Sequence, residues 1–227
     1  DDATGPLPLS SFDVLDTVLE ALADAADYPD LEQVVIAGHS GGAQVVQRYA
    51  AVSHGDRALA ARGVRTRYVV ANPSTYLYFD AQRPTLDGHF APLDTHTEAG
   101  AQANAWKYGL DNLPAYVERQ HGACGTGDIE REYVGRDVVV LLGERDCDPR
   151  HPALDRSPGA LAQGEHRLAR GLAYSRYILA RHPGNTRHRT LTIPGIGHDP
   201  KGIFGSQPGL KALFDFEERP CAKTAQG

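Results

Sequence analysis

Four apolar stretches of the chain have the pattern of strands that are buried on both faces of a parallel sheet. They cover residues 34–37, 67–71, 137–143 and 189–193, are rich in Val, Ile and Leu, and each ends at or just before a Gly, Asn or Pro. Because parallel strands need long crossover connections, helical segments are expected between them.

Three other segments show helical periodicity, with apolar residues repeating every three or four positions. The first follows Ser10, which forms a capping-box pattern with Asp13, and ends near residue 27. A long helix is expected over about 160–181, and a last one begins near Pro208. The positions assigned to their inward faces are Leu15, Val18, Leu19 and Leu22, then Leu161, Leu168, Leu172, Ile178 and Leu179, then Leu210, Leu213 and Phe214.

Strands that alternate with helices predict an α/β fold, in which right-handed crossovers place helices on both faces of a parallel sheet. The length of 227 residues fits a single domain over 1–227. Residues from about 74 to 136 lack steady periodicity and are rich in Tyr, Pro, Gly and His, so an inserted cap over a pocket is expected there. Within it, Trp106, Tyr108 and Tyr116 form either an apolar wall for an acyl or aryl group or the small core of the cap.

Composition narrows the classes of partner. The formal net charge is −6 and the basic residues are scattered, which argues against nucleic acid or an anionic membrane surface. No apolar stretch approaches the roughly 20 residues of a transmembrane helix. Pairs such as Asp94 and His96 do not make a metal-ligand set, and no P-loop occurs, so no metal and no cofactor are expected.

The chain has three cysteines, which are too few for a disulfide scaffold. We expect one disulfide and one free thiol among Cys124, Cys147 and Cys221, with three free thiols as the alternative. Loop cysteines persist best in oxidising compartments, so a secreted or periplasmic protein is expected, with the cytoplasm as the alternative.

The first strand leads directly into a sharp turn that carries a serine. Residues 38–42 read Gly-His-Ser-Gly-Gly and match G-x-S-x-G, the nucleophile elbow, with a helix predicted after it over 43–50. Gly38 and Gly42 leave room for this tight turn, and Ser40 is lifted clear of the sheet. The N–H of Gly41, at the start of the helix, is placed to donate to an oxyanion.

Two later strands end in residues that complete this chemistry. Residues after the third strand include Asp146, which is expected to accept a hydrogen bond from a histidine, with Asp148 in reserve and Glu144 as a weaker third choice. His198 follows the fourth strand on a glycine-flanked loop and is the expected general base for Ser40. The carboxyl ends of parallel strands share one edge of the sheet, so the three side chains are expected to meet there.

Three residues beside this edge are expected to contact a substrate. Asn72 begins a short stretch after the second strand that should rim the pocket, and Tyr76 follows in it. Ordinary turn chemistry explains the stretch equally well. His39 precedes the serine and either contacts the substrate or packs under the turn.

The order serine, aspartate, histidine is that of the α/β-hydrolase fold. The chain resembles α/β-hydrolases from the helix before the turn to the helix after the histidine loop, and is similar to a group of bacterial and fungal esterase-like hydrolases. The stretches that carry this resemblance are AGHSGGAQVVQRYA, VVANPSTYLYFD, LLGERDCDP, AQGEHRLARG and IPGIGHD. The resemblance implies Ser40 as nucleophile, His198 as base, Asp146 as acid and Gly41 in the oxyanion hole.

One departure from the α/β-hydrolase pattern concerns the strands before the elbow. The fold normally has eight strands, whereas only one helix precedes the elbow here, so the strands beyond the elbow strand and the second oxyanion donor are missing. An exposed edge strand is costly, and we therefore expect this to be the C-terminal part of a longer polypeptide, or a chain that a companion completes.

The resulting hypothesis is a serine hydrolase that cleaves small-molecule carboxylic esters through an acyl-enzyme. The alternatives are an acyltransferase or peptidase that uses the same residues, and a binding protein that keeps the fold without activity. Ester is preferred only because it is the commoner substrate of the fold.

Overall fold

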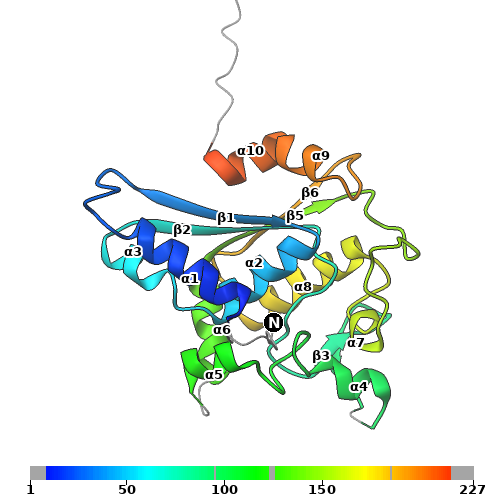
Figure 1. The fold of residues 1–227 in the computed structure, drawn as a ribbon. Helices are drawn as coiled ribbons and strands as arrows, with labels where there is room; N and C mark the ends of the chain where they lie inside the picture. The colour runs from blue at the N-terminus through cyan, green and yellow to red at the C-terminus, as the bar shows by residue number, and fades with distance from the viewer. Residues whose placement is uncertain (1–8, 95, 123–125, 185, 216–227) are drawn as a thin grey trace, which may run out of the picture.

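The computed structural model describes residues 9–94, 96–122, 126–184 and 186–215. Its centre is a four-stranded parallel sheet of order β1-β2-β5-β6, drawn across the middle of Figure 1. The four predicted strands are confirmed, with β1 and β2 longer than expected. Their bounds are Gln33–His39 (β1), Arg65–Ala71 (β2), Asp137–Gly143 (β5) and Arg189–Ile193 (β6).

Helices cover both faces of this sheet, as the alternation of elements predicted (Figure 1). The larger hydrophobic cluster lies on one face, and Tyr68 and Val70 of β2 point into it. A smaller cluster on the opposite face takes Val69 and Ala71 of the same strand. The helices on the first face include α1 (Ser11–Leu22), α2 (Gly41–Val52), α3 (Arg57–Ala61), α6 (Thr126–Gly135) and α8 (Arg167–Arg181), and those on the second are α9 (Pro200–Gly205) and α10 (Gln207–Phe214).

Helix α1 begins where its sequence predicts. The Ser10 side chain accepts from the backbone N–H of Phe12 and Asp13, and the Asp13 carboxylate accepts from the Ser10 N–H, so both halves of the capping box are present. Its buried side chains are Phe12 and Leu19, while Val18, predicted to face inward, is exposed.

The single helix predicted over 160–181 is two helices. Helix α7 (Pro158–Leu161) stops, and α8 starts only at Arg167, because Gly164 between them adopts a positive φ of 139° that a continuous helix does not permit. The predicted inward face was wrong in part: Ile178 is buried and Leu168 packs against the core, whereas three leucines are exposed and tyrosines and small residues face the core in their place. The exposed three are Leu161, Leu172 and Leu179.

The physical reason is the close approach of α8 to the sheet. A Cβ added at Gly171 would lie 2.5 Å from a methyl carbon of Leu142 on β5. Only a helix face with small residues permits this packing distance, and the flat rings of Tyr174 and Tyr177 fill the space on either side.

Residues 72–136 between β2 and β5 hold more order than their sequence pattern predicted. They form an antiparallel hairpin of β3 (Gln82–Pro84) and β4 (Phe90–Pro92), followed by three helices. These helices are α4 (Glu98–Ala103), α5 (Ala115–His121) and α6. Helix α4 packs against α7. That residues 74–136 act as a cap stays a prediction.

Two further expectations can be compared with the described residues. Cys147 is exposed with a free thiol, whereas Cys124 and Cys221 lie outside the described residues, so the expected disulfide stays a prediction. Within the described ranges, the helices are all too short or too polar to cross a bilayer.

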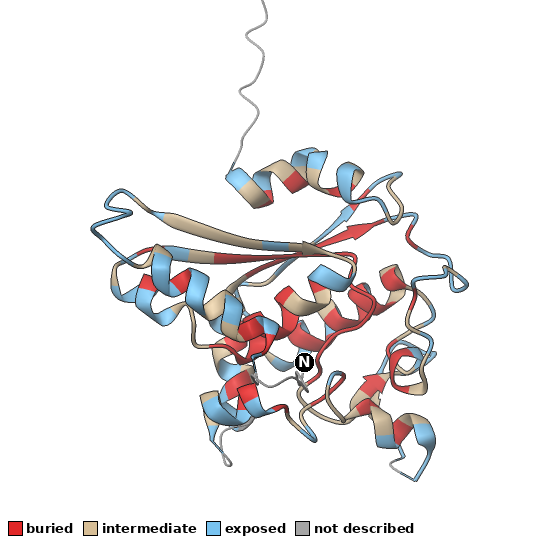
Figure 2. Ribbon diagram, viewed as in Figure 1, coloured by how far each residue is buried: buried red, intermediate tan, exposed pale blue. Residues whose placement is uncertain are grey.

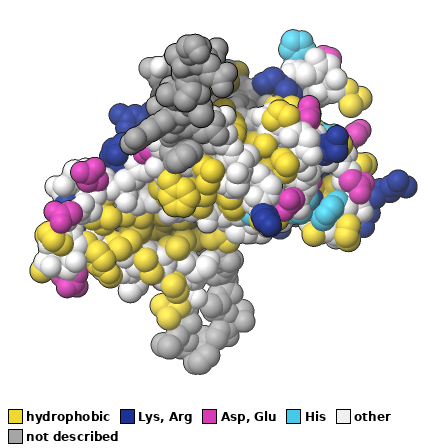
Figure 3. Space-filling view, turned by 90° about the horizontal axis from the view of Figure 1, so that it is seen from above, with side chains coloured by type: hydrophobic (Ala, Val, Ile, Leu, Met, Phe, Trp, Pro, Cys, Tyr) yellow, Lys and Arg dark blue, Asp and Glu magenta, His cyan; other side chains and the backbone are white. Residues whose placement is uncertain are grey.

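Strand β1 forms one edge of the described sheet. It pairs only with β2 there, and each of its seven residues is half-buried or exposed, whereas β2 and β5 are largely buried (Figure 2). Figure 3 looks onto the molecule from the side of α9 and α10 and shows hydrophobic side chains gathered over a broad part of this surface. Because β1 is an edge strand of the described sheet, the turn after it, which carries Ser40, follows an edge strand as expected.

Candidate active site

The turn between β1 and α2 has the geometry of a nucleophile elbow. Ser40 has φ 56° and ψ −115°, a strained backbone for a residue with a side chain, and its N–H donates to the carbonyl of Ala71 at 2.9 Å. Gly38 is required here, because a Cβ on it would overlap the backbone of Gly42 and lie 2.8 Å from the nitrogen of Ala43. At Gly42 an added Cβ meets nothing within 4 Å, so that glycine is not needed for space.

The structure brings Ser40, His198 and Asp146 into one chain of hydrogen bonds. His198 Nε2 lies 2.9 Å from Ser40 Oγ, and His198 Nδ1 lies 2.7 Å from Asp146 Oδ2. The three residues lie 158 and 52 positions apart in sequence and follow the carboxyl ends of β1, β6 and β5. With Nδ1 protonated toward Asp146, Nε2 is left to accept from the serine hydroxyl.

Asp146 is the carboxylate that contacts His198, and the two alternative carboxylates, Asp148 and Glu144, make other contacts. Asp148 is exposed and accepts from the N–H of Arg150 in its own turn. Glu144 accepts from the N–H of Gly195. Asp146 is buried and, although burial by itself raises the pKa of its carboxyl, the hydrogen bond from His198 and the charges of His198 and Arg167 leave that pKa lowered.

Arg167 is a site residue that sequence reasoning missed. It is the first residue of α8, is almost fully buried, and its Nη1 lies 3.3 Å from Asp146 Oδ1. The carboxylate therefore has an imidazole on one oxygen and a guanidinium on the other. This contact has no signature in the sequence, because an arginine in a helix is ordinarily solvated.

Asn72 holds the strand ends together beneath these residues. Its Nδ2 donates to the carbonyl of Gly197 at 3.2 Å, and its Oδ1 accepts from the N–H of Gly143 at 2.8 Å. Its φ of 46° lies in the left-handed region, which Asn tolerates better than most residues. Since Gly197 precedes His198, Asn72 fixes the histidine loop against β5, and its amide is fully engaged with the protein and buried.

His198 lies between two further imidazoles. The ring centroid of His39 is 4.5 Å from that of His198, and His151 approaches edge-on at 5.0 Å. Burial, followed by the charge of His198, lowers the pKa of His39 to about 4, so His39 is neutral at neutral pH. It is half-buried beneath the turn, with Nε2 3.5 Å from Asn72 Nδ2.

Tyr76 does not rim the site, contrary to expectation. Its ring is fully buried and stacks on Tyr174 of α8 at 4.5 Å, and Tyr78 is fully buried as well. The stretch after β2 turns inward because its backbone is held by buried amides: Gln163 bonds to both the N–H and the carbonyl of Tyr76. The buried amide of Gln47 on α2 likewise accepts from the N–H of Leu77.

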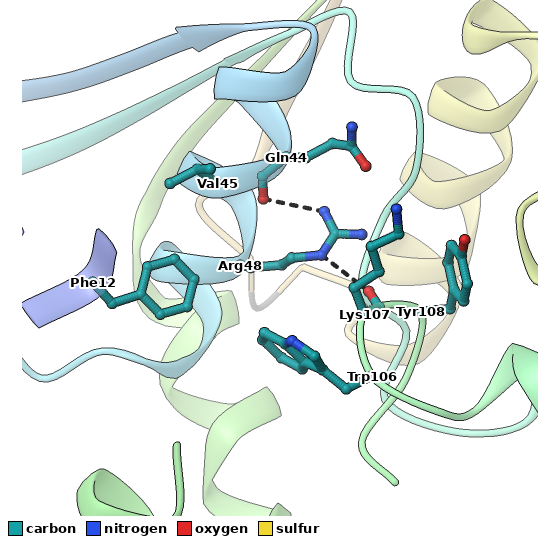
Figure 4. Close-up of a pocket in the computed structure, with 7 residues that line it drawn as sticks. All are labelled: Phe12, Gln44, Val45, Arg48, Trp106, Lys107 and Tyr108. Atoms are coloured by element: carbon teal, nitrogen blue, oxygen red, sulfur yellow. Dashed lines mark hydrogen bonds between the residues drawn. The ribbon is translucent and has the colours of Figure 1, made fainter. Parts of the chain in front are cut away.

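A pocket of about 480 Å³ runs along α2, beginning one helical turn after Ser40. Arg48 is buried at the base of this pocket and donates to the carbonyls of Gln44 and Lys107 (Figure 4). The described residues that line the pocket are Phe12, Gln44, Val45, Arg48, Trp106, Lys107 and Tyr108. Ser40 and His198 are not among them.

Trp106, Tyr108 and Tyr116, which were expected either to form an apolar wall or to make up a small core, lie in two different places. Trp106 and Tyr108 line this pocket, whereas Tyr116 is buried against Phe12 and donates to Asp16 Oδ2 at 2.9 Å.

The pair Asp94 and His96 forms a local turn, in which Asp94 accepts from the N–H of His96. Among the described residues, no group of three or more His, Cys, Asp or Glu is arranged to hold a metal ion.

Gly41 is the first residue of α2, so its N–H has no acceptor within the helix. It directly follows Ser40 and belongs to the positive end of the helix dipole. These are the properties required of a donor to an oxyanion.

The solved structures that are similar to this chain include the following two. One is LpqC, a poly(3-hydroxybutyrate) depolymerase from Bordetella parapertussis, with a TM-score of 0.60 and 24% identity over 97% of this chain and 63% of that one. The other is poly(aspartic acid) hydrolase-1 from Sphingomonas sp. KT-1, with a TM-score of 0.56 and 23% identity over 91% of this chain and 64% of that one. No family model matches the chain, and no curated protein matches it.

These similarities show the fold. The parallel sheet with helices on both faces is that of α/β-hydrolases, as predicted. The chain spans less than two thirds of the length of each of these two proteins.

Proposed function

We propose that this protein is a serine hydrolase that cleaves carboxylic esters. The observation that carries the proposal is the hydrogen-bonded series from Ser40 Oγ through the His198 ring to Asp146, built on a strained turn. Both structural neighbours are named as enzymes that break down polymers, one a depolymerase and one a hydrolase, which supports hydrolysis as the type of reaction.

In the proposed mechanism, Ser40 Oγ attacks the ester carbonyl carbon and its proton passes to His198 Nε2. Asp146 stabilises the imidazolium that forms and fixes the ring so that Nε2 faces the serine. The N–H of Gly41 donates to the oxyanion. His198 then gives its proton to the leaving alkoxide, which departs as the alcohol and leaves an acyl group on Ser40. A water deprotonated by His198 releases the acid and restores the hydroxyl.

We further propose that another polypeptide segment, from the same protein or a companion chain, pairs with the free edge of β1. An edge strand of seven residues with no fully buried side chain, directly before the nucleophile, exposes unpaired backbone groups and apolar surface. The same segment would supply the second oxyanion donor. A 227-residue chain that is active and monodisperse when made alone would contradict this proposal.

A binding protein on the same fold is the competing function. The strained φ of Ser40 and the buried Asp146 argue for catalysis, since neither is needed to hold a ligand. Acyl transfer and peptide cleavage use the same side chains and differ in what occupies the acceptor and leaving-group positions.

The test is an activity screen with p-nitrophenyl esters of graded acyl length, on the protein and its Ser40→Ala variant, with labelling by a fluorophosphonate probe. We expect labelling of Ser40 and a loss of about 10³-fold or more in kcat for Ser40→Ala, as for other enzymes that lose one member of such a unit. Absence of labelling in the complete protein would favour the binding protein.

A further inference from the structure

The buried ion pair of Arg167 and Asp146 is not explained by stability. Both side chains are at most 3% exposed, and Arg167 touches the carboxylate through a single nitrogen at 3.3 Å. Its Nη2 donates to the carbonyl of Ala153 at 2.6 Å, while its Nε is buried without a hydrogen-bond partner. A buried pair that leaves donors unsatisfied is ordinarily no more stable than apolar residues of the same volume.

The two contacts on Asp146 constrain the carboxylate from both sides. His198 Nδ1 takes Oδ2 and Arg167 Nη1 takes Oδ1, so the group cannot rotate about its last bond without losing one of them. The backbone adds to this, because the N–H of Leu168, next to Arg167, donates to the carbonyl of Asp146 at 3.1 Å. The start of α8 therefore holds both the main chain and the side chain of Asp146.

The charge of Arg167 acts on the same pair. Among the described residues, the titratable and charged groups next to Asp146 or His198 are His39 at the end of β1, Tyr76 after β2, His151 after β5 and Arg167 at the start of α8. Asp199 follows His198 in sequence, and its charge acts on His39. Among these groups, Arg167 is the one that is a cation at every pH a protein tolerates. It stabilises an ionised Asp146, and it opposes a positive charge on His198.

We propose that Arg167 is a positioning residue that orients the Asp146 carboxylate toward His198 and extends the active pH range of the pair to lower pH. This inference rests on the proposed serine hydrolase function. Loss of the cation makes protonation of both Asp146 and His198 easier, so the two effects have the same sign: the acid limb of the activity profile moves up in pH.

The test is the pH dependence of kcat/KM for a p-nitrophenyl ester in Arg167→Met, Arg167→Gln and Arg167→Lys, each normalised by fluorophosphonate titration of competent Ser40. A charge within about 4–6 Å typically shifts a titration by about 1–3 units. We expect the acid limb of the two neutral variants to rise by about 1 pH unit, with kcat lowered ~10-fold or more and KM little changed. Arg167→Lys, which keeps the charge, should retain a limb within ~0.3 unit of the parent protein.

Arg170 provides the matched control. It is another buried arginine on α8, three residues further on, and it bonds to the carbonyls of Ser74, Asp155 and Gly164 rather than to Asp146. Arg170→Met should lower stability without moving the acid limb. Coincident acid limbs in the parent and the neutral Arg167 variants, or an equal movement in Arg170→Met, would overturn the assignment.

If the neutral variants do not fold, a charge-balanced pair decides the matter. Asp146→Asn together with Arg167→Met leaves neither buried charge unpaired, and its rate of Ser40 labelling is compared with that of Asp146→Asn alone across pH. The acid limb of the labelling profile should lie about 1 pH unit higher in the double variant than in Asp146→Asn. Identical acid limbs in the two variants would refute the proposed role of Arg167. Failure of the proposed function has a different signature, since the parent protein would then neither label at Ser40 nor lose activity in Ser40→Ala.

Discussion

Replacing Asn72 gives a prediction that connects the stability of the fold with the position of the histidine. Asn72→Ala removes the donor to the Gly197 carbonyl and the acceptor for the Gly143 N–H, both at a residue that is 1% exposed. Each orphaned group costs about 1–3 kcal/mol. An alanine at the positive φ of 46° costs about 1 kcal/mol more. We expect the free energy of unfolding to fall by about 4 kcal/mol in total.

The assay is urea unfolding, followed by the signal of the aromatic residues and extrapolated to water. Asn72→Gly loses the same two hydrogen bonds without the backbone penalty, so it should be about 1 kcal/mol more stable than Asn72→Ala. Asn112 is the matched control, because it also has a positive φ, of 55°, but is exposed. Asn112→Ala should lose only about 1 kcal/mol.

Activity reports the second half of the same prediction. Freed from Asn72, the loop that carries Gly197 and His198 can shift relative to Ser40, and misplacement by about 1 Å costs on the order of 10²-fold in rate. We expect kcat for the preferred ester to fall ~10–10²-fold in Asn72→Gly, with KM nearly unchanged. If Asn72→Ala were no less stable than Asn112→Ala, the hydrogen bonds would contribute nothing and the reasoning would be wrong.

Two further predictions concern the elbow and the response to acid. Gly38→Ala places a Cβ against the backbone of Gly42 and Ala43, so Ser40 labelling should be lost or slowed by about 10²-fold. Gly42→Ala is the control, because a Cβ there meets open space; its free energy of unfolding should equal that of the parent or exceed it by up to ~1 kcal/mol. Burial lowers the pKa of His188 to about 4, below the ~6.5 of an unfolded chain. The contribution of the neutral, buried ring to the free energy of unfolding is therefore complete above pH ~6.5 and is lost as the pH falls toward 4. Between pH 7 and 4.5, His188→Gln should therefore lose about 2 kcal/mol less of its unfolding free energy than the parent, and equal losses would contradict the assignment.

The sequence was sufficient where local pattern and global position coincide. Strands β5 and β6 occupy the predicted residues because continuous apolar runs between turn residues have few other stable conformations in a folded domain. The capping box at Ser10 formed for the same reason, since both of its hydrogen bonds are local. The juxtaposition of Ser40, Asp146 and His198 was also predictable, because each directly follows the carboxyl end of a parallel strand and those ends share one edge.

The predictions failed where a residue's environment is set by distant parts of the chain. Apolar spacing placed Leu161, Leu172 and Leu179 inward, yet they are exposed. Helix α8 approaches the sheet so closely at Gly171 that a Cβ there would overlap Leu142, and its buried face is built largely of small residues and tyrosines. Tyr76 was expected at the rim, but the amides of Gln47 and Gln163 draw its segment into the core. Buried polar side chains of this kind carry no periodic signature, because their partners are backbone groups far away in sequence.

What the sequence by itself determined is the order of the strands along the chain, the elbow and the candidate reacting groups, since these depend on residue type and on short-range spacing. Only the tertiary structure decided what surrounds them. Arg167 lies on the second oxygen of Asp146, and Asn72 ties the histidine loop to β5. Both contacts follow from packing between residues that lie 21 to 125 positions apart in the sequence. A hydrogen bond between such residues depends on distances of tenths of an ångström, which are fixed only when the whole core is assembled.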